Sequence, residues 1–135
     1  MACNPNNSNP PPRPTDAELA ILRVLWDHGA STVREVHEAP GAGNDVGYTT
    51  TLKLLQRMAD KGLVERDESR RSHVYQARSK EEPTQRRLVA DLLKKAFAGS
   101  TPSLVMQALS AKKASKAELA EIRQLLDEME KGDGK

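Results

Sequence analysis

The alternation of apolar and polar positions is clearest between residues 48 and 77. Four residues recur at i, i+3, i+4 and i+7, the spacing of one face of an α-helix: Thr51, Leu54, Leu55 and Met58. Gly62 follows, and glycine most easily adopts the left-handed conformation that ends a helix. Two short apolar runs then flank a polar turn, Leu63-Val64 before it and Val74-Tyr75 after it. The pattern predicts a helix followed by a two-stranded hairpin.

Two further helices are predicted before this one. Thr15 and Glu18 have the spacing of a capping box, in which each side chain accepts a hydrogen bond from the other's backbone amide. Four residues after them mark one apolar face: Leu19, Leu22, Leu25 and Trp26. A shorter helix follows, capped by Ser31 or Thr32. The order helix, helix, helix and hairpin predicts a winged helix-turn-helix over residues 15–80.

The remaining positions of the third helix carry hydroxyls, an amide and cations, and the tip of the hairpin carries two arginines. Such groups hydrogen-bond base edges and phosphates, so the segment is predicted to bind DNA. The candidate DNA-binding residues are Tyr48, Thr49, Thr50, Lys53, Gln56, Arg57, Arg70 and Arg71, and Lys61 lies on the same polar face. Three of them have other roles open: Thr50 as a helix cap, Arg57 in an ion pair with Asp60 or Glu65, and Tyr48 in packing at the helix start.

Residues 81–131 are predicted to form a helical domain with three amphipathic helices. Thr101 is expected to cap the middle helix, and a capping box at Ser115 and Glu118 begins the last one. These helices either extend the core of one monomer or form a dimerisation region. We favour a homodimer, because two linked half-sites bind DNA far more tightly than one. The expected dimer residues are Leu104, Val105, Leu119, Ile122, Leu125 and Leu126.

Composition agrees with a small, mostly α-helical protein with a β-wing. The net charge of +2 is weak support for DNA binding, but residues 53–80 hold eight Lys or Arg against four Asp or Glu. Residues 1–14 are rich in Asn and Pro and are predicted to be a disordered tail. Cys3 is the one cysteine, and no apolar run is long enough to span a bilayer, so we expect a cytoplasmic protein without membrane insertion.

Catalysis and cofactor binding find no support in the residues. The three histidines, His28, His37 and His73, are scattered and lack the spacing of a metal site. Two other functions remain open beside DNA-binding repression. A winged helix can be a protein-interaction module, but exposed apolar residues would then be expected on the third helix, where Leu52 is the one exception. A small-molecule-sensing regulator needs a lined cavity, and aromatic residues are only 3% of the chain.

Residues 15–131 resemble the penicillinase repressor family (the BlaI/MecI/CopY group). The resemblance lies in the order and spacing of several motifs: Leu25-Trp26, Val33-Arg34-Glu35-Val36, Tyr48-Thr49-Thr50, Leu54-Leu55, Arg57, Lys61-Gly62-Leu63-Val64, Tyr75, and Gly99 followed by Ser103-Leu104-Val105. It implies a homodimeric repressor that binds a palindromic operator. It also implies derepression by proteolysis after a membrane-bound sensor metalloprotease responds to β-lactam.

This chain departs from the family at the implied cleavage site. The dipeptide Gln107-Ala108 lies where well-known members carry Asn-Phe. The departure implies either a protease of different specificity or no cleavage at this bond. The copper-responsive branch carries a C-terminal Cys-x-Cys pattern, and this chain has no cysteine after Cys3, which excludes copper sensing by thiolates.

Overall fold

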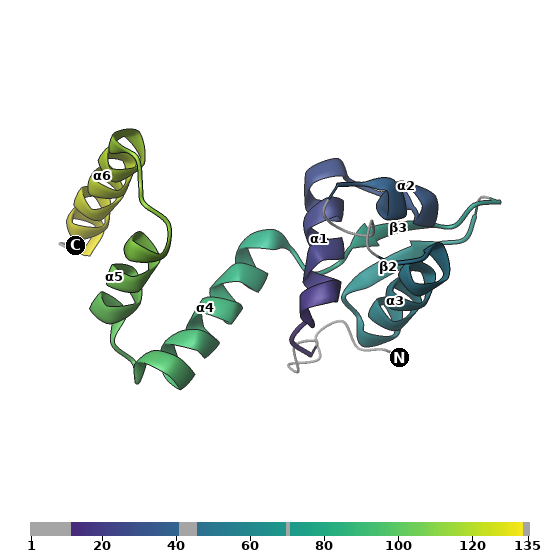
Figure 1. Ribbon diagram of the computed structural model, residues 1–135, viewed down its shortest axis with the longest axis horizontal. Helices are drawn as coiled ribbons and strands as arrows, with labels where there is room; N and C mark the ends of the chain where they lie inside the picture. Colours follow the sequence, from purple (N-terminus) through teal and green to yellow (C-terminus); the bar gives the residue numbers. More distant parts are fainter. Residues whose placement is uncertain (1–11, 41–45, 70, 134–135) are drawn as a thin grey trace. The chain divides into compact units, whose positions relative to one another are not determined.

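The computed structural model describes residues 12–40, 46–69 and 71–133. Its elements, in order, are α1 (Asp16–His28), β1 (Ser31–Thr32), α2 (Val33–Glu38), α3 (Tyr48–Lys61), β2 (Val64–Asp67), β3 (Val74–Ala77), α4 (Glu81–Phe97), α5 (Thr101–Ala111) and α6 (Lys116–Asp133) (Figure 1). The chain divides into two compact units, residues 1–88 and 89–135. We call these the winged-helix unit and the C-terminal unit. The division lies within α4.

A capping box begins α1, as the sequence predicts, and a second one begins α2. The Thr15 amide donates to Glu18 Oε1 at 2.9 Å, and the Glu18 amide donates to Thr15 Oγ1 at 3.2 Å. The same reciprocal pair joins Thr32 and Glu35 at the start of α2. Thr32 is therefore the cap of α2. Ser31 lies in β1, where its hydroxyl donates to the carbonyl of Gly29.

The wing is a three-stranded antiparallel sheet in the order β1-β3-β2, rather than the predicted two-stranded hairpin. β3 is the central strand. It pairs Val74 with Thr32 and Tyr75 with Ser31 on one side, and it pairs with β2 on the other. β1 has only two residues, too few for an alternating apolar pattern to be recognised in the sequence. This short strand ties the start of α2 to the end of β3 that follows the hairpin turn.

The end of α3 sets the path of the chain into the wing. Gly62 ends the helix with a φ of 86°, in the left-handed conformation, as predicted. The Leu63 amide then donates to the carbonyl of Met58, and the Leu63 carbonyl accepts from Arg78 and Ser79 after β3. Both ends of the hairpin are thereby held at the C-terminal end of α3.

The core of the winged-helix unit lies between α1, α2, α3 and the sheet. Its buried residues are Ile21, Leu22, Val24, Leu25, Val33, Val36, Ala39, Leu55, Met58, Leu63, Val64 and Tyr75. Trp26, predicted to lie in the core, packs against its edge and is half-buried. Its indole N–H donates to the carbonyl of Ser79 at 2.8 Å, which ties α1 to the chain just after β3.

The C-terminal unit contains helices that bury little within one chain. Ser100, not Thr101, caps α5: its hydroxyl accepts from the Ser103 amide at 3.3 Å. Thr101 is instead the first helical residue, and Pro102 follows in the first turn. The predicted capping box of α6 is confirmed, with Ser115 and Glu118 as reciprocal partners. No described residue of α5 or α6 is buried.

Candidate nucleic-acid interface

Helix α3 separates an inward apolar face from an outward polar face. Thr51, Leu55 and Met58 are buried at i, i+4 and i+7 and turn one side of the helix to the core. The other side carries exposed candidate residues: Tyr48, Thr49, Thr50, Lys53, Gln56 and Arg57. One helix thus presents a hydroxyl pair at its first turn and cations along its length, all open to solvent.

The first turn of α3 leaves Thr49 and Thr50 without a capping role. Gly47 is the N-cap and supplies no side chain to the free amides. The Thr51 hydroxyl instead turns back to the Gly47 carbonyl, at 3.5 Å. The alternative of Thr50 as a cap is therefore wrong, and the hydroxyls of both exposed threonines remain available at the helix N-terminus.

Cations on α3 fall into two groups. Lys53 and Arg57 are exposed and form no ion pair with any residue that the structure describes, so the alternative pairing of Arg57 with Asp60 or Glu65 is absent. Lys61, expected on the outward face, behaves differently. Its ammonium lies 2.8 and 2.9 Å from the two carboxylate oxygens of Glu18 on α1.

The Glu18–Lys61 pair has a structural role. The Glu18 side chain is 1% exposed and that of Lys61 is 25% exposed. Burial alone would raise the pKa of the Glu18 carboxyl, but hydrogen bonds from Lys61 and Thr15 outweigh burial and hold its pKa below the ordinary value. Glu18 therefore serves twice, as the capping residue of α1 and as the partner that fixes the C-terminal end of α3 to α1.

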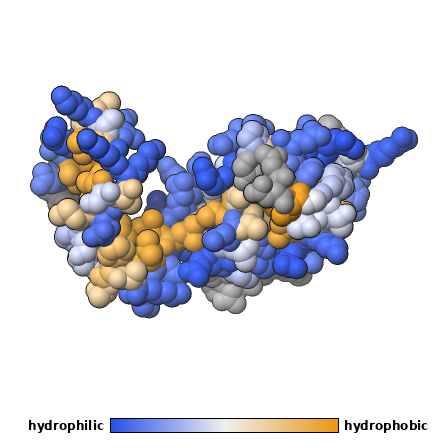
Figure 2. Space-filling model, viewed as in Figure 1, coloured by the Kyte–Doolittle hydropathy of each residue, from blue (hydrophilic) through white to orange (hydrophobic). Residues whose placement is uncertain are grey.

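The wing carries both paired and unpaired cations. Arg66 on β2 lies 2.6 Å from Glu68, and Arg78 lies 4.0 Å from Glu65. Arg71 is exposed, and no ion pair joins it to another residue in the described ranges. Arg70, the other predicted tip residue, lies outside the described residues. The hairpin projects from the winged-helix unit, and its surface is hydrophilic (Figures 1 and 2).

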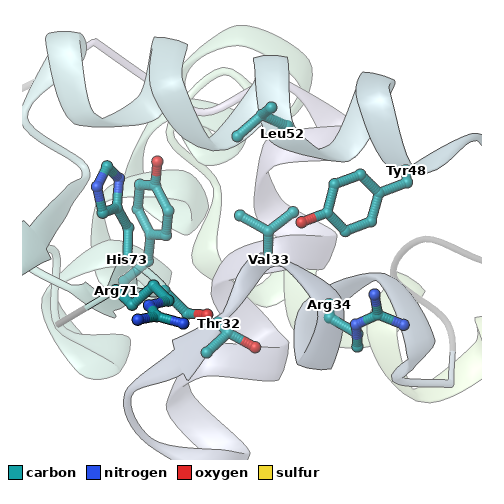
Figure 3. Close-up of a pocket in the computed structure, with 9 residues that line it drawn as sticks. Thr32, Val33, Arg34, Tyr48, Leu52, Arg71 and His73 are labelled. Atoms are coloured by element: carbon teal, nitrogen blue, oxygen red, sulfur yellow. The ribbon is translucent and has the colours of Figure 1, made fainter. Parts of the chain in front are cut away.

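A hollow of about 400 Å³ opens between α2, the N-terminal end of α3 and the wing (Figure 3). Tyr48 and Leu52 of α3 line it together with Tyr75, so both tyrosines of the chain reach it. Leu52, the apolar exception on the outward face, thus forms a wall of this hollow. Aromatic residues are scarce in this chain, but two tyrosines that lie far apart in the sequence converge on this hollow.

Tyr48 is half-exposed, and its ring makes an edge-to-face contact with His37 at a centroid distance of 5.9 Å. His37 packs in this way, and its buried Nδ1 has no hydrogen-bond partner among the residues that the structure describes. Across residues 12–40, 46–69 and 71–133, no three His, Cys, Asp or Glu side chains cluster as a metal site would require. None of the described helices has the length and apolar character needed to cross a membrane.

A three-helix unit with a hydroxyl- and cation-bearing third helix and a basic wing defines a winged-helix DNA-binding protein. The model of the penicillinase repressor family matches residues 14–128. The chain belongs to this family of winged-helix transcriptional repressors, and the family is not enzymatic.

Individual proteins of known class are similar to this chain. The transcriptional regulator BlaI of Mycobacterium tuberculosis is 34% identical over 121 residues, which cover 88% of this chain and 86% of the relative. The penicillinase repressor of Staphylococcus aureus is 22% identical and covers 85% of this chain and 91% of its own length. The solution structure of the DNA-binding domain of the repressor BlaI aligns with a TM-score of 0.47 and 26% identity, over 54% of this chain and 89% of that domain.

Proposed function

We propose that this repressor acts in the cytoplasm as a homodimer that places two α3 helices on a palindromic operator. The observation that carries the proposal is the outward face of α3, where Thr49, Thr50, Lys53, Gln56 and Arg57 are all exposed. Threonine and glutamine side chains suit base edges, and cations suit phosphates. Tyr48 and the wing arginines, Arg70 and Arg71, would contact the flanking backbone.

The C-terminal unit supports the dimer. Several large apolar side chains on its helices are exposed: Val89, Leu92, Val105, Met106, Leu125, Leu126 and Met129. Apolar side chains are visible at the surface of this unit (Figure 2). Amphipathic helices gain stability by burying such a face, and a second copy offers a matching one. The proposed dimer residues are Leu104, Val105, Leu119, Ile122, Leu125 and Leu126, which are half-buried or exposed in the single chain.

Proteolysis within this unit is the proposed route to derepression. Gln107 and Ala108 are exposed near the middle of α5, so an opening of this helix would present the bond between them to a protease. A cut there would separate the remaining helix α6 from the DNA-binding half. A membrane-bound sensor metalloprotease is the proposed agent. Each winged-helix unit would then bind its half-site of the operator independently and far more weakly.

The dimer is tested with an operator selected from random-sequence duplexes. Fluorescence anisotropy would compare the full palindrome with a single half-site, while sedimentation reports the mass. Leu125→Glu/Leu126→Glu should give monomers that lose the preference for the full palindrome. Gln124→Glu, which adds a charge to an exposed position on the opposite side of α6, is the matched control. A monomeric wild-type chain, or no sequence preference over random DNA, would refute the proposal.

A further inference from the structure

The hollow beside α3 combines two kinds of surface (Figure 3). Its apolar part comes from Val33 and Leu52 with the buried Tyr75. Its polar part comes from Arg34 and Arg71 with hydroxyl and imidazole side chains beside them, and none of the described residues that line it carries a carboxylate. The hollow is therefore cationic at its rim and apolar within. This combination suits a ligand with a negative group attached to an apolar body.

The two arginines that line the hollow come from different elements. Arg34 belongs to α2 and Arg71 to the wing, and in Figure 3 they lie on opposite sides of Val33. The Arg34 side chain is 75% exposed, and its contact with Glu38 is 4.0 Å long between two exposed groups. Such a pair contributes little and leaves the guanidinium able to bind another anion.

Tyr48 connects the hollow to the outward face of α3. Its ring lies across the hollow with the hydroxyl directed toward Val33 (Figure 3). Thr49 and Thr50 follow immediately on the exposed first turn. A duplex in contact with these threonines and with Arg71 would carry its backbone across the hollow, because the hollow lies between the two elements.

We infer that the hollow holds one sugar–phosphate unit of the operator backbone, with Arg34 and the Tyr48 hydroxyl as phosphate ligands. The deoxyribose would cover the apolar part, and the phosphate would meet the guanidinium groups at the rim. The inference rests on the proposed function and adds α2 to the DNA-binding surface. Its role is to set the register of α3 on the bases, since backbone contacts position a protein and base contacts specify the sequence.

A thermodynamic cycle between protein and DNA tests this assignment. Duplexes of the selected operator would each carry one neutral methylphosphonate in place of one phosphate. Arg34→Gln should weaken binding to the unmodified duplex about tenfold, the scale of one lost hydrogen bond to a charged group. The wild type should lose affinity when the phosphate held in the hollow is replaced by methylphosphonate. Arg34→Gln should show no further loss of affinity for that modified duplex. The slope of DNA affinity against salt concentration, on logarithmic scales, should fall by about one released counterion.

Matched variants distinguish this role from general charge and from folding. Arg23→Gln removes an exposed cation of α1 that does not line the hollow, and it should leave the methylphosphonate pattern unchanged. Tyr48→Phe removes one hydroxyl, keeps the ring beside His37, and should reduce sensitivity at the same backbone position as Arg34→Gln. Circular dichroism should be unchanged in all three, because Arg34, Arg23 and Tyr48 are exposed.

A free sulfate ion presents the same negatively charged oxygens as a phosphate of the DNA backbone. Sulfate, added at constant ionic strength against chloride, should compete with DNA for the wild type more than for Arg34→Gln. If sulfate competes in this way but no methylphosphonate position couples to Arg34, the assignment to DNA backbone is overturned. If Arg34→Gln equals the wild type while the wild type selects an operator, this inference fails and the proposed function stands. If the wild type selects no operator, both fail.

Discussion

The buried pair of Glu18 and Lys61 should be worth more to the winged-helix unit than any exposed ion pair. Lys61→Met would leave a carboxylate that is 1% exposed without its cation. Breaking a buried pair from one side costs about 3–5 kcal/mol. Because Glu18 keeps its hydrogen bonds to Thr15, we expect the lower end, about 3 kcal/mol of unfolding free energy.

Glu18→Gln should cost less. Glutamine also serves in a capping box, and the ammonium left behind on Lys61 is 25% exposed and can be hydrated. The expected loss is about 1.5–2 kcal/mol, the lower part of the range for a hydrogen bond to a charged group. The double variant Glu18→Gln/Lys61→Met should recover part of the loss in Lys61→Met, because it buries no unpaired charge.

The pH dependence has a defined sign. The folded-state pKa of Glu18 lies below its unfolded value of about 4.3. The ionised carboxylate therefore makes its full contribution to the free energy of unfolding above that pH. It is lost as the pH falls through the lower, folded-state pKa. Glu18→Gln should therefore be less stable than the wild type at neutral pH, and this difference should shrink in acid.

Urea unfolding followed by tryptophan fluorescence measures this directly. Trp26 is the chain's single tryptophan and lies at the edge of the winged-helix core, so it reports on that unit. The protein concentration must be constant, because a dimer would add its own contribution. Two results would refute the reasoning: Lys61→Met within 0.5 kcal/mol of the wild type, by the usual range of surface substitutions, or the same pH profile in Glu18→Gln as in the wild type.

Other predictions concern DNA binding, the end of α3 and the C-terminal unit. Arg71→Ala should weaken binding to all duplexes alike and lower the salt dependence by about one counterion, whereas an altered consensus sequence would contradict a backbone contact. Thr49→Ala or Thr50→Ala should change the sequence selected from random duplexes, at about 1–3 kcal/mol per lost base contact, and an unchanged consensus would show that these residues do not read bases. Gly62→Ala should cost about 1 kcal/mol in urea unfolding because φ is 86°, and no loss would mean that the turn relaxes. A chain ending before Thr101 should sediment as a folded monomer that binds the operator weakly, and a truncated dimer with full affinity would remove this region from dimerisation.

Local sequence patterns predicted the helices of the winged-helix unit well, and the reason is physical. Capping boxes and the 3.6-residue period act between residues three or four apart, so they can be read directly. They located α1, α2 and α3 correctly. On α1 the pattern chose Leu19 and Trp26, which are half-buried, and missed Ile21 and Val24, which are buried. Which of these positions is buried depends on how the helix is tilted against its neighbours.

Features made by distant residues could not be predicted in the same way. Glu18 and Lys61 are 43 positions apart, and each had a plausible local role, as a capping residue and as a surface cation. The hollow likewise requires α2, α3 and the wing to be in place before Arg34 and Arg71 share a rim. In both cases, tertiary packing places side chains together that have no relation of spacing in the sequence.

The pairing of charges explains why a net charge of +2 understates this surface. Three cations between residues 53 and 80 are paired with carboxylates: Lys61 at the end of α3 with Glu18 of α1, Arg66 with Glu68 and Arg78 with Glu65 in the wing. In the part of this segment that the structure describes, the cations without such pairs are Lys53, Arg57, Arg71 and Lys80. Three of these four lie on the outward face of α3 or on the wing. The unpaired cations among the described residues of this segment are thus concentrated where the proposed duplex would lie.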